Sequence, residues 1–314
     1  MTRFVISTST FDIEHNPHVQ YLIQQGMSVV SNPHRRKLNE EEIIELLDKD
    51  TVGLIAGIEP LTAHVFASAK QLKVVSRCGT GLDSVDLVAA QQHNIAVFNT
   101  PVAPSQAVAE LTLGLILATL RRICQTDRFL RRGEWPRLQG QLLAAQTVGI
   151  IGLGHIGQRV AHLCQAFGAK VIAHDPYLKQ SPQDVKLMTF EQLLNEADII
   201  TLHVPYSADI HHLLDANAFA CMKSGAIIIN AARGGLVDES ALSKALDHGK
   251  LGAAALDAFE QEPYKGPLIR NDKVILTSHI GSLAREARQR MEIEAAENLL
   301  QGLIETGLIN DKKK

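Results

Sequence analysis

The chain contains 314 residues, of which 46% are apolar and 21% are charged, and its formal net charge is −3. An apolar share of this size supports a large core, and the length suggests two domains of ordinary size. The small net charge argues against nucleic acid or an anionic membrane as a partner, because the one basic run, residues 312–314, lies at the chain end.

Targeting and redox features also narrow the possibilities. The apolar stretch at residues 4–7 is too short for a signal peptide, and the run at 111–120 falls short of the roughly 20 residues that a membrane span needs. The cysteines stand far apart, without a CxxC spacing, at Cys78, Cys124, Cys164 and Cys221. We therefore expect a cytoplasmic protein with reduced thiols and no metal site.

In the first hundred residues, short β-branched runs alternate with helical patterns. Strands are predicted at residues 4–7, 29–31, 54–56, 74–76 and 95–98, and helices near residue 20 and at 41–47, 63–70 and 87–92. Strands and helices that alternate at this spacing predict an α/β domain with a parallel, doubly wound sheet.

A segment with two prolines, residues 100–104, precedes a long apolar stretch. Proline fits the entry of a helix and disrupts its interior, so this segment predicts a domain boundary followed by a helix that runs to about Ile123. The helix is apolar on nearly every side. It is therefore expected to be buried, either inside a core or against another subunit.

The stretch 147–175 has the features of a βαβ dinucleotide-binding unit. A strand leads into Gly152-x-Gly154-x-x-Gly157, a helix follows, and a second strand ends at Asp175. The first glycine permits a tight turn, the second lets the backbone approach a pyrophosphate, and the third lets helix and strand pack closely. The helix N-terminus supplies free N–H groups, and the acid accepts hydrogen bonds from ribose hydroxyls. GxGxxG alone recurs by chance, but strand, helix and acid agree here.

The second half continues with strands at 199–203, 226–229, 252–256 and 274–276, separated by helices near 190–195, 217–222 and 239–247. It therefore predicts a complete open α/β sheet of its own. A last helix is predicted at 283–303, with an apolar residue at every fourth position. Because the second sheet is complete without it, this helix is free to pack elsewhere, including on the first domain.

Three stretches follow predicted strands of the second half, at the sheet edge where open α/β proteins bind ligands. Arg233 stands between a strand end and a glycine pair, which suits a bidentate grip on a carboxylate; pairing with a surface acid is the alternative. Glu262 and His279 lie in the other two stretches. A carboxylate held against a histidine fixes its tautomer and makes it a proton donor and acceptor near neutral pH. Sequence alone does not bring these two residues together in space.

An earlier glycine pair, Gly79-Thr80-Gly81, follows the predicted strand at 74–76. Consecutive backbone N–H groups in such a turn form a nest that suits an anion, for example a carboxylate. A tight turn from strand to helix explains the same residues equally well.

Several ordered motifs make the chain resemble the D-isomer-specific 2-hydroxyacid dehydrogenase family, and within it the short, bacterial-type D-3-phosphoglycerate dehydrogenases. The resemblance extends from about residue 56 to residue 299. Its motifs are SRCGTGLDSVDL (76–87), NTP (99–101), AVAELTLGLIL (107–117), TVGIIGLGHIG (147–157), NAARGGLVDE (230–239), AALDAFEQEP (254–263) and SHIGS (278–282). Motifs in this order are specific for the family and less so for the substrate.

The resemblance implies a role for each of three residues. Arg233 would hold the carboxylate of a small 2-hydroxy or 2-keto acid and polarise its C2 oxygen. His279 would take the hydroxyl proton as hydride leaves C2, while Glu262 orients and charges the imidazole. The same substrate would touch the backbone of residues 79–81.

The cofactor implied by the resemblance is NAD. Its contacts are expected at Gly152, Gly154, His155, Ile156, Gly157, Asp175, Ala231, Ala232, Asp257, Ile280, Gly281 and Ser282. Among these, Asp257 would bind the nicotinamide amide. NAD is favoured over NADP because Asp175 would repel a 2′-phosphate and no arginine follows it.

The resemblance further implies two doubly wound domains with a cleft between them. Residues 1–99 and 285–314 would form a discontinuous, flavodoxin-like substrate-binding domain, and residues 100–284 a Rossmann NAD-binding domain. The last helix then returns to the first domain. A homodimer through the cofactor domain is also implied, which would give the apolar helix at 107–120 a partner.

The chain departs from the family pattern at three places. Ser278 replaces a usual proline before the histidine, and Tyr206 replaces a usual leucine near the cofactor. Many phosphoglycerate enzymes carry an arginine just after the strand at 54–56, whereas this chain has AGIEP at 56–60. Arg77 remains as the basic residue available to a phosphate.

The sequence therefore favours an NAD-dependent dehydrogenase that oxidises 3-phosphoglycerate to 3-phosphohydroxypyruvate in serine biosynthesis. A glyoxylate or hydroxypyruvate reductase, which needs no phosphate site, is the alternative within the family. A third hypothesis is a corepressor-like binding protein that senses NAD(H), since a fold alone does not establish activity. The presence of Arg233, Glu262 and His279 argues against it.

Overall fold

The computed structural model describes residues 2–182 and 184–310. The chain divides into two compact units, which we call unit 1 (1–104 with 284–314) and unit 2 (105–283). Each unit is an α/β structure around its own parallel sheet, which confirms the predicted fold class. Among the described residues, no helix combines the length and apolar character that crossing a membrane requires.

Unit 1 is built on a five-stranded parallel sheet in the order β2-β1-β3-β4-β5. This order is typical of flavodoxin-like folds. Asparagine, threonine or aspartate side chains cap the N-termini of its first four helices, so the sequence itself marks where each helix begins. The elements are β1 (Arg3–Ile6), α1 (Pro17–Gln24), β2 (Ser28–Ser31), α2 (Glu40–Leu46), β3 (Thr51–Ala56), α3 (Ala63–Ser68), β4 (Val74–Arg77), α4 (Leu87–Gln92), β5 (Ala96–Asn99) and α11 (Arg285–Glu305).

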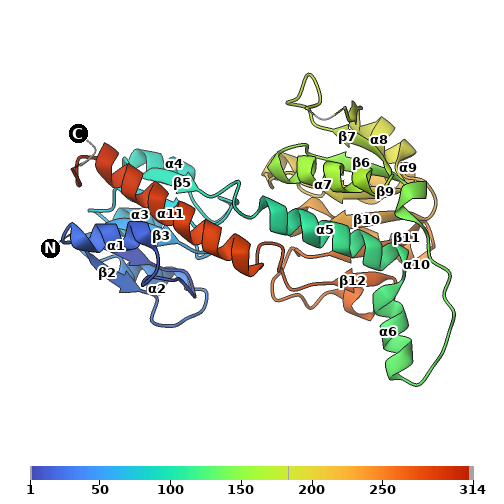
Figure 1. Cartoon of the computed structure of the whole chain (residues 1–314), viewed down its shortest axis with the longest axis horizontal. Coiled ribbons are helices and arrows are strands. Elements are labelled where there is room, and N and C mark those ends of the chain that lie inside the picture. Colours follow the sequence, from blue (N-terminus) through green and yellow to red (C-terminus); the bar gives the residue numbers. More distant parts are fainter. Residues whose placement is uncertain (1, 183, 311–314) are drawn as a thin grey trace. The chain divides into compact units, whose positions relative to one another are not determined.

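Helix α11 comes last in the sequence but packs on the sheet of unit 1, against β3, β4, β5 and α1. Figure 1 shows it in red beside the blue elements of the N-terminus. Glycines allow the close approach: a Cβ at Gly53 would lie 2.7 Å from Leu299 Cδ1, and one at Gly302 would lie 2.6 Å from Val74 Cγ1. The apolar residues at every fourth position, including Leu299 and Leu303, are fully buried in this contact.

Unit 2 carries a seven-stranded parallel sheet in the order β12-β11-β10-β9-β6-β7-β8. Short 3-10 turns connect several of its elements. The helices and strands are α5 (Ser105–Leu120), α6 (Ile123–Arg131), β6 (Thr147–Ile151), α7 (His155–Ala166), β7 (Lys170–His174), β8 (Lys186–Leu187), α8 (Phe190–Glu196), β9 (Ile199–Leu202), α9 (Ala216–Cys221), β10 (Ala226–Asn230), α10 (Glu239–Asp247), β11 (Leu251–Leu256) and β12 (Val274–Leu276).

The strand order of unit 2 reverses between β6 and β9, which lie side by side although β7 and β8 separate them in the sequence. Crossovers leave such a pair in opposite directions, so a crevice opens at its carboxyl end, where dinucleotides bind. The glycine-rich turn that follows β6 occupies this position. The fold therefore supports the predicted location of a cofactor.

The helix predicted to run to about Ile123 corresponds to α5, which ends slightly earlier, and a second helix that was not predicted follows it. Helix α5 ends at Leu120, Arg122 adopts a left-handed conformation with φ 55°, and α6 begins at Ile123. The chain returns beneath the break, where the N–H of Gln141 donates to the Leu120 carbonyl oxygen at 3.0 Å. Part of α5 is buried against α7 and the sheet, whereas Glu110 and Gly114 on another side are exposed. Periodicity did not reveal this break, because Arg121 and Arg122 are good helix formers.

Candidate active site

The glycine-rich turn of unit 2 leaves the N-terminus of α7 open. Gly152 has a φ of +91°, and a Cβ there would lie 2.6 Å from the carbonyl oxygen of His203, whereas nothing lies within 4 Å of a Cβ built at Gly154. Within the described chain α7 has no side-chain cap, and both Gly154 and His155 are exposed. Free N–H groups at the positive end of a helix, facing open space, fit a pyrophosphate.

Asp175 lies where the acid of a dinucleotide site is expected, directly after β7. Its Oδ2 accepts the N–H of Leu153 at 2.9 Å, and its Oδ1 accepts the N–H of Tyr177 at 3.0 Å. The first bond ties the carboxylate to the glycine-rich turn itself. Because both oxygens are already oriented, the partly exposed carboxylate can accept ribose hydroxyls without rearrangement. The residues of this turn therefore fit the adenosine half of NAD.

Arg233 is fixed by the backbone that follows β10. The side-chain amide of Asn230 donates to the Arg233 carbonyl oxygen at 2.7 Å, and its oxygen accepts the N–H of Ala232 at 3.0 Å. The guanidinium Nη1 donates to the Ala232 carbonyl oxygen at 2.8 Å. Ala231 and Ala232 lie partly buried at this strand end. A Cβ at Gly234 would lie 1.8 Å from the carbonyl carbon of Phe259, so this loop lies directly against the loop after β11.

The side chains of Glu262 and His279 are hydrogen-bonded to each other, although their positions differ by 17 in the sequence. The Nδ1 atom of His279 lies 2.9 Å from Oε1 and 3.0 Å from Oε2 of Glu262. Oε1 also accepts the N–H of Phe259 at 3.1 Å, which orients the carboxylate from its other side. With Nδ1 donating to this carboxylate, Nε2 is left as the proton acceptor of the neutral ring.

The backbone of His279 is held in a left-handed conformation, with φ 55°. Asp257 supplies the constraint: its carboxylate accepts the Thr277 hydroxyl at 2.6 Å and the N–H groups of Ile280 and Gly281 at 2.9 and 2.8 Å. Asp257 is only 1% exposed. Its contacts within the protein thus fix the histidine loop, a function that the sequence did not indicate. Ile280 is exposed, Gly281 is buried and Ser282 is partly buried.

A group of residues that sequence reasoning did not single out surrounds the Glu262 loop. Glu239, in the first turn of α10, accepts the N–H of Glu260 at 2.9 Å, and Tyr264 lies near it. His212 Nε2 lies 2.6 Å from Oε1 of Glu260. Burial raises the pKa of Glu239, and the neighbouring Glu260 carboxylate adds to the increase. No spacing signal links these positions, because they meet only through the fold.

The predicted substrate loop, residues 77–81, lies in unit 1 at the carboxyl end of β4. Gly79 has a φ of +149°, and a Cβ there would overlap the Arg77 guanidinium, with 1.6 Å to Nη1. The guanidinium also donates to the carbonyl oxygen of Cys78. The loop therefore encloses a positive charge beneath its own backbone. Thr80 is exposed and Gly81 is partly buried, while burial raises the pKa of Cys78 to about 11, which keeps this thiol protonated.

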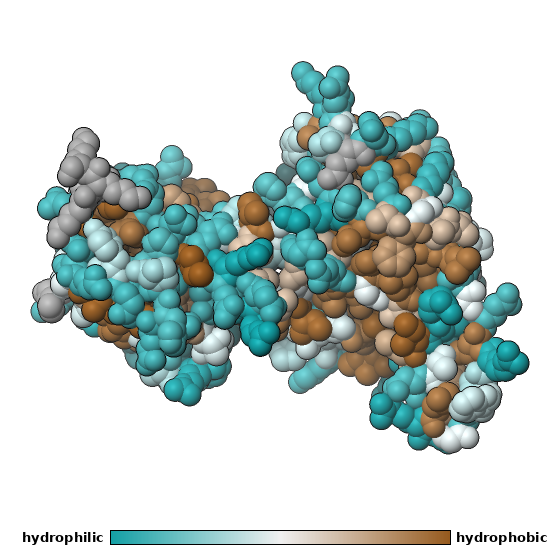
Figure 2. All heavy atoms as spheres, in the orientation of Figure 1, coloured by the Kyte–Doolittle hydropathy of each residue, from teal (hydrophilic) through white to brown (hydrophobic). Residues whose placement is uncertain are grey.

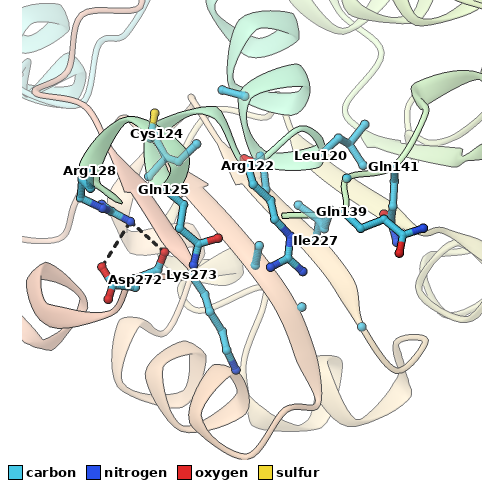
Figure 3. A pocket seen from close by; sticks show the side chains of 17 residues that line it. Leu120, Arg122, Cys124, Gln125, Arg128, Gln139, Gln141, Ile227, Asp272 and Lys273 are labelled. Carbon is cyan, nitrogen blue, oxygen red and sulfur yellow. Dashed lines mark hydrogen bonds and ion pairs between the residues drawn. The ribbon is translucent and has the colours of Figure 1, made fainter. Parts of the chain in front are cut away.

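A hollow of about 520 Å³ lies elsewhere in unit 2, between α6 and the sheet (Figure 3). Its walls include Gly225, Gly252 and Lys273, which precede or begin β10, β11 and β12. The hollow thus opens at the amino ends of these strands, whereas Arg233, Glu262 and His279 follow their carboxyl ends. Figure 3 shows Arg128 of α6 reaching Asp272, an ion pair of 3.3 Å. The hollow is therefore distinct from the candidate active site.

Residues 113–281 match the family described as D-isomer specific 2-hydroxyacid dehydrogenase, NAD binding domain. The chain is 42% identical to the D-3-phosphoglycerate dehydrogenase of Methanocaldococcus jannaschii over 283 residues, which are 87% of this chain and 54% of that protein. It therefore spans about half the length of this relative. It is 37% identical to the hydroxypyruvate reductase of Thermotoga maritima over 290 residues, or 90% of this chain and 94% of that one.

A solved structure is also similar over nearly the whole chain. The glyoxylate reductase from Paecilomyes thermophila superposes with a TM-score of 0.87 at 29% identity, covering 98% of this chain and 97% of that one. The order of motifs, the strand order of both sheets and these likenesses agree. The chain belongs to the D-isomer-specific 2-hydroxyacid dehydrogenase family, and its second unit carries the NAD-binding domain of that family.

Proposed function

We propose that the chain transfers hydride between NAD and a D-2-hydroxy acid, with Arg233, Glu262 and His279 as the catalytic residues. The observation that carries the proposal is the Glu262–His279 pair, 2.9 Å apart, at the carboxyl end of the sheet that also presents the glycine-rich turn. A buried aspartate and a left-handed backbone hold the histidine there. Backbone strain of this kind collects at functional sites.

In this proposal His279 exchanges the proton of the C2 hydroxyl. Because Nδ1 faces Glu262, the proton moves to Nε2 as the C2 hydrogen leaves with its electron pair. The Glu262 carboxylate stabilises the imidazolium that forms and keeps the ring in the productive tautomer. In the reverse direction the imidazolium returns the proton to the C2 oxygen.

Arg233 would bind the substrate carboxylate through its guanidinium and draw electron density toward the C2 oxygen. NAD, held by the open N-terminus of α7 and by Asp175, supplies the hydride acceptor when it is bound. The ordered loop from Thr277 to Gly281 would face the nicotinamide end of the cofactor. Asp257 would contribute there by fixing that loop, in addition to the amide contact that the resemblance implies.

The test is NADH absorbance with a panel of 2-keto acids, with and without a phosphate group. We expect turnover on at least one acid with NADH in preference to NADPH, and we expect His279→Gln to lose this turnover. A wild-type protein that binds NADH but turns over no 2-keto acid would instead favour an NAD(H)-sensing function.

Within this reaction we propose 3-phosphoglycerate as the hydroxy acid. Support comes from the identity to a phosphoglycerate dehydrogenase and from the Arg77 guanidinium, which lies under the 79–81 loop. A hydroxypyruvate or glyoxylate reductase is the second candidate. It is supported by the hydroxypyruvate reductase relative, which the chain matches over nearly its full length. It is also supported by Ala56, which lies beside Arg77 on the adjacent strand, just before the place where many phosphoglycerate enzymes carry an arginine.

The ratio of kcat/KM for phosphohydroxypyruvate to that for hydroxypyruvate separates these candidates. If Arg77 binds the phosphate, Arg77→Ala lowers this ratio about tenfold or more, since a charged hydrogen bond contributes about 1.5–3 kcal/mol. A purely structural effect on the loop would lower both values equally, and Arg77→Lys controls for charge. A wild-type ratio near one would reject the phosphoglycerate assignment.

We also propose that unit 2 forms a homodimer through α5, α6 and the segment after α6, residues 132–142. Figure 2 shows apolar side chains gathered on the face of unit 2 that carries α5. Large apolar residues are exposed on α6 and after it, namely Ile123, Leu130, Trp135 and Leu142, with Trp135 80% exposed. Light scattering after gel filtration should give twice the chain mass, and Leu142→Glu should halve it. A monomeric wild type would contradict the proposal.

A further inference from the structure

Two loops of the candidate active site meet backbone to backbone, and one side chain outside them holds their junction. We propose that Glu239 is a positioning residue for the Glu262–His279 pair. The inference rests on the proposed function, because it concerns how that pair is kept in its productive geometry. Glu239 belongs to α10, and in the described part of the chain it makes no hydrogen bond to Glu262 or His279, so it acts through the loop that carries Glu262.

The first step is the bond from the loop to Glu239. The N–H of Glu260 donates to Oε1 of Glu239 at 2.9 Å. The preceding residue, Phe259, donates its own N–H to Glu262 Oε1 at 3.1 Å. Two successive backbone N–H groups thus donate to two different carboxylates. The carboxylate of Glu262 contacts His279, and that of Glu239 belongs to a helix. A change in the φ or ψ angle of Phe259 alters the angle between these two N–H groups and therefore disturbs at least one of the bonds.

The second step is the aromatic contact at the far end of the loop. Tyr264 stacks on Phe259, with ring centroids 4.3 Å apart and planes inclined by 22°. Its hydroxyl accepts the N–H of Leu268 at 3.2 Å, and burial, together with the charge of the nearby Glu239 carboxylate, raises the pKa of Tyr264. Glu239 is therefore hydrogen-bonded to the loop before Glu262 and lies near the aromatic ring that follows it.

The third step is the balance of charge around Glu239. Glu260 brings a second carboxylate close to it, and His212 faces Glu260 from the opposite side, 2.6 Å from its Oε1. The rings of His211 and His212 are stacked, with centroids 3.8 Å apart, and His211 Nδ1 lies 3.2 Å from the hydroxyl oxygen of Tyr206. Polar contacts of this kind form a network that orders the loop around the partly buried Glu239.

The fourth step is the direct link to Arg233. Gly234 lies against the carbonyl group of Phe259, where a Cβ would come within 1.8 Å of the carbon. Glu239 follows Gly234 through one 3-10 turn, η3 (Gly234–Leu236), before α10 begins. The same short segment therefore carries Arg233 at one end and the anchor of the Glu262 loop at the other. This couples the group that would bind the carboxylate to the pair that would move the proton.

The experiment compares Glu239→Ala with Glu239→Gln and Tyr264→Phe. Glu239→Ala should lower kcat about tenfold to a hundredfold, as expected when a reacting pair loses its alignment, while KM for NAD changes less than about twofold. Glu239→Gln keeps an oxygen that accepts the Glu260 N–H, so it should restore kcat to within about threefold of wild type. Tyr264→Phe, which removes one hydroxyl only, should fall between them.

Asp238→Ala is the matched control. Asp238 caps the same helix by accepting the Ala241 N–H at 2.9 Å, so its loss should lower the Tm without lowering kcat. The readout independent of turnover is the pair of ring ¹⁵N shifts of His279, assigned with His279→Gln. Wild type and Glu239→Gln should show the Nδ1–H tautomer in the neutral ring, whereas Glu239→Ala should show a mixture.

Each outcome decides the question. If wild type turns over a 2-keto acid and Glu239→Ala keeps kcat and the single tautomer, the positioning role is rejected while the proposed function stands. The role is also rejected if the Tm and kcat fall together in both Glu239→Ala and Asp238→Ala. If wild type has no turnover but the tautomer responds to Glu239→Ala as expected, the positioning role stands and the proposed function fails.

Discussion

The two sheets of this protein have carboxyl ends of contrasting chemistry. In unit 2, adjacent strands lead to an arginine, a glutamate and a histidine, each held by hydrogen bonds from neighbouring residues. In unit 1, the corresponding edge presents backbone, in the form of the glycine turn at 79–81 lying over the Arg77 guanidinium. Under the proposed function, side chains of unit 2 would carry the chemistry, whereas the turn of unit 1 would contribute backbone donors and one charge.

The largest expected effect tests the chemical role of unit 2. His279→Gln should lower kcat about a thousandfold, because general acid–base catalysis contributes about a hundred to ten thousandfold. Binding of NADH, followed by fluorescence transfer from Trp135 or by calorimetry, should stay within about threefold of wild type. If His279→Gln kept more than a tenth of the wild-type kcat, His279 would not be the general acid–base residue. The chemical role assigned to unit 2 would then be wrong.

The next effect tests the backbone role of unit 1. Gly79→Ala introduces a Cβ at φ +149°, where it overlaps the Arg77 guanidinium. We expect a loss of about 2–3 kcal/mol in the free energy of unfolding, from strain of about 1–3 kcal/mol together with the displaced side chain, and a clear rise in substrate KM. Urea unfolding by circular dichroism and steady-state kinetics measure the two.

Gly26→Ala is the control for this substitution. Gly26 also has a positive φ, +88°, but nothing lies within 4 Å of a Cβ there. It should cost about 1 kcal/mol, the usual penalty for a residue that is not glycine in this conformation, without changing KM. Equal effects of the two variants on KM would show that the 79–81 loop has no special part in binding.

A smaller effect concerns the acid sensitivity of unit 2. Burial lowers the pKa of His203 from 6.5 to about 3, and its Nδ1 is buried without a partner among the described residues. The unfolded chain binds a proton at His203 more readily than the folded protein does. Above pH 6.5 the ring is neutral in both states, so the free energy of unfolding has its full value there. It decreases as the pH falls toward 3, by about 2 kcal/mol between pH 6.5 and 4.5, because one pKa unit corresponds to about 1.4 kcal/mol. His203→Gln should flatten the decline of unfolding free energy between pH 6.5 and 4.5; an unchanged slope would contradict this.

The smallest effect is the counterpart in unit 1. The hydrogen bond from Arg36, with help from the Asn39 N–H, lowers the pKa of Glu42 from 4.5 to about 2. Its contribution to stability is therefore present above pH 4.5 and is lost as the pH falls toward 2. Glu42→Gln should reduce the change in stability between pH 4.5 and 2 only slightly, since this pair lies at the surface. Acid titration of Tm measures it, and a change as large as that in His203→Gln would reverse the expected order.

Much of the architecture was predictable because local signals agree with the fold. β-branched runs marked the strands, and the surplus of the final helix indicated that it was free to pack outside the second sheet. Helix α6 and the two-residue strand β8 escaped prediction. Neither has a clear local signal: α6 is separated from α5 by a break over which the chain returns at Gln141, and β8 is a strand only because it pairs with β7.

The sequence by itself determined the family, the glycine-rich turn and the identity of Arg233, Glu262 and His279 as candidates, since residue type and order along the chain carry that information. Only the tertiary structure placed the Glu262 carboxylate 2.9 Å from the His279 ring, and only it identified Asp257 as the brace of the histidine loop and Glu239 as the anchor of the glutamate loop. These contacts join positions on different strands and helices. Their distances depend on how parallel strands are ordered in the sheet, a property that no local pattern encodes.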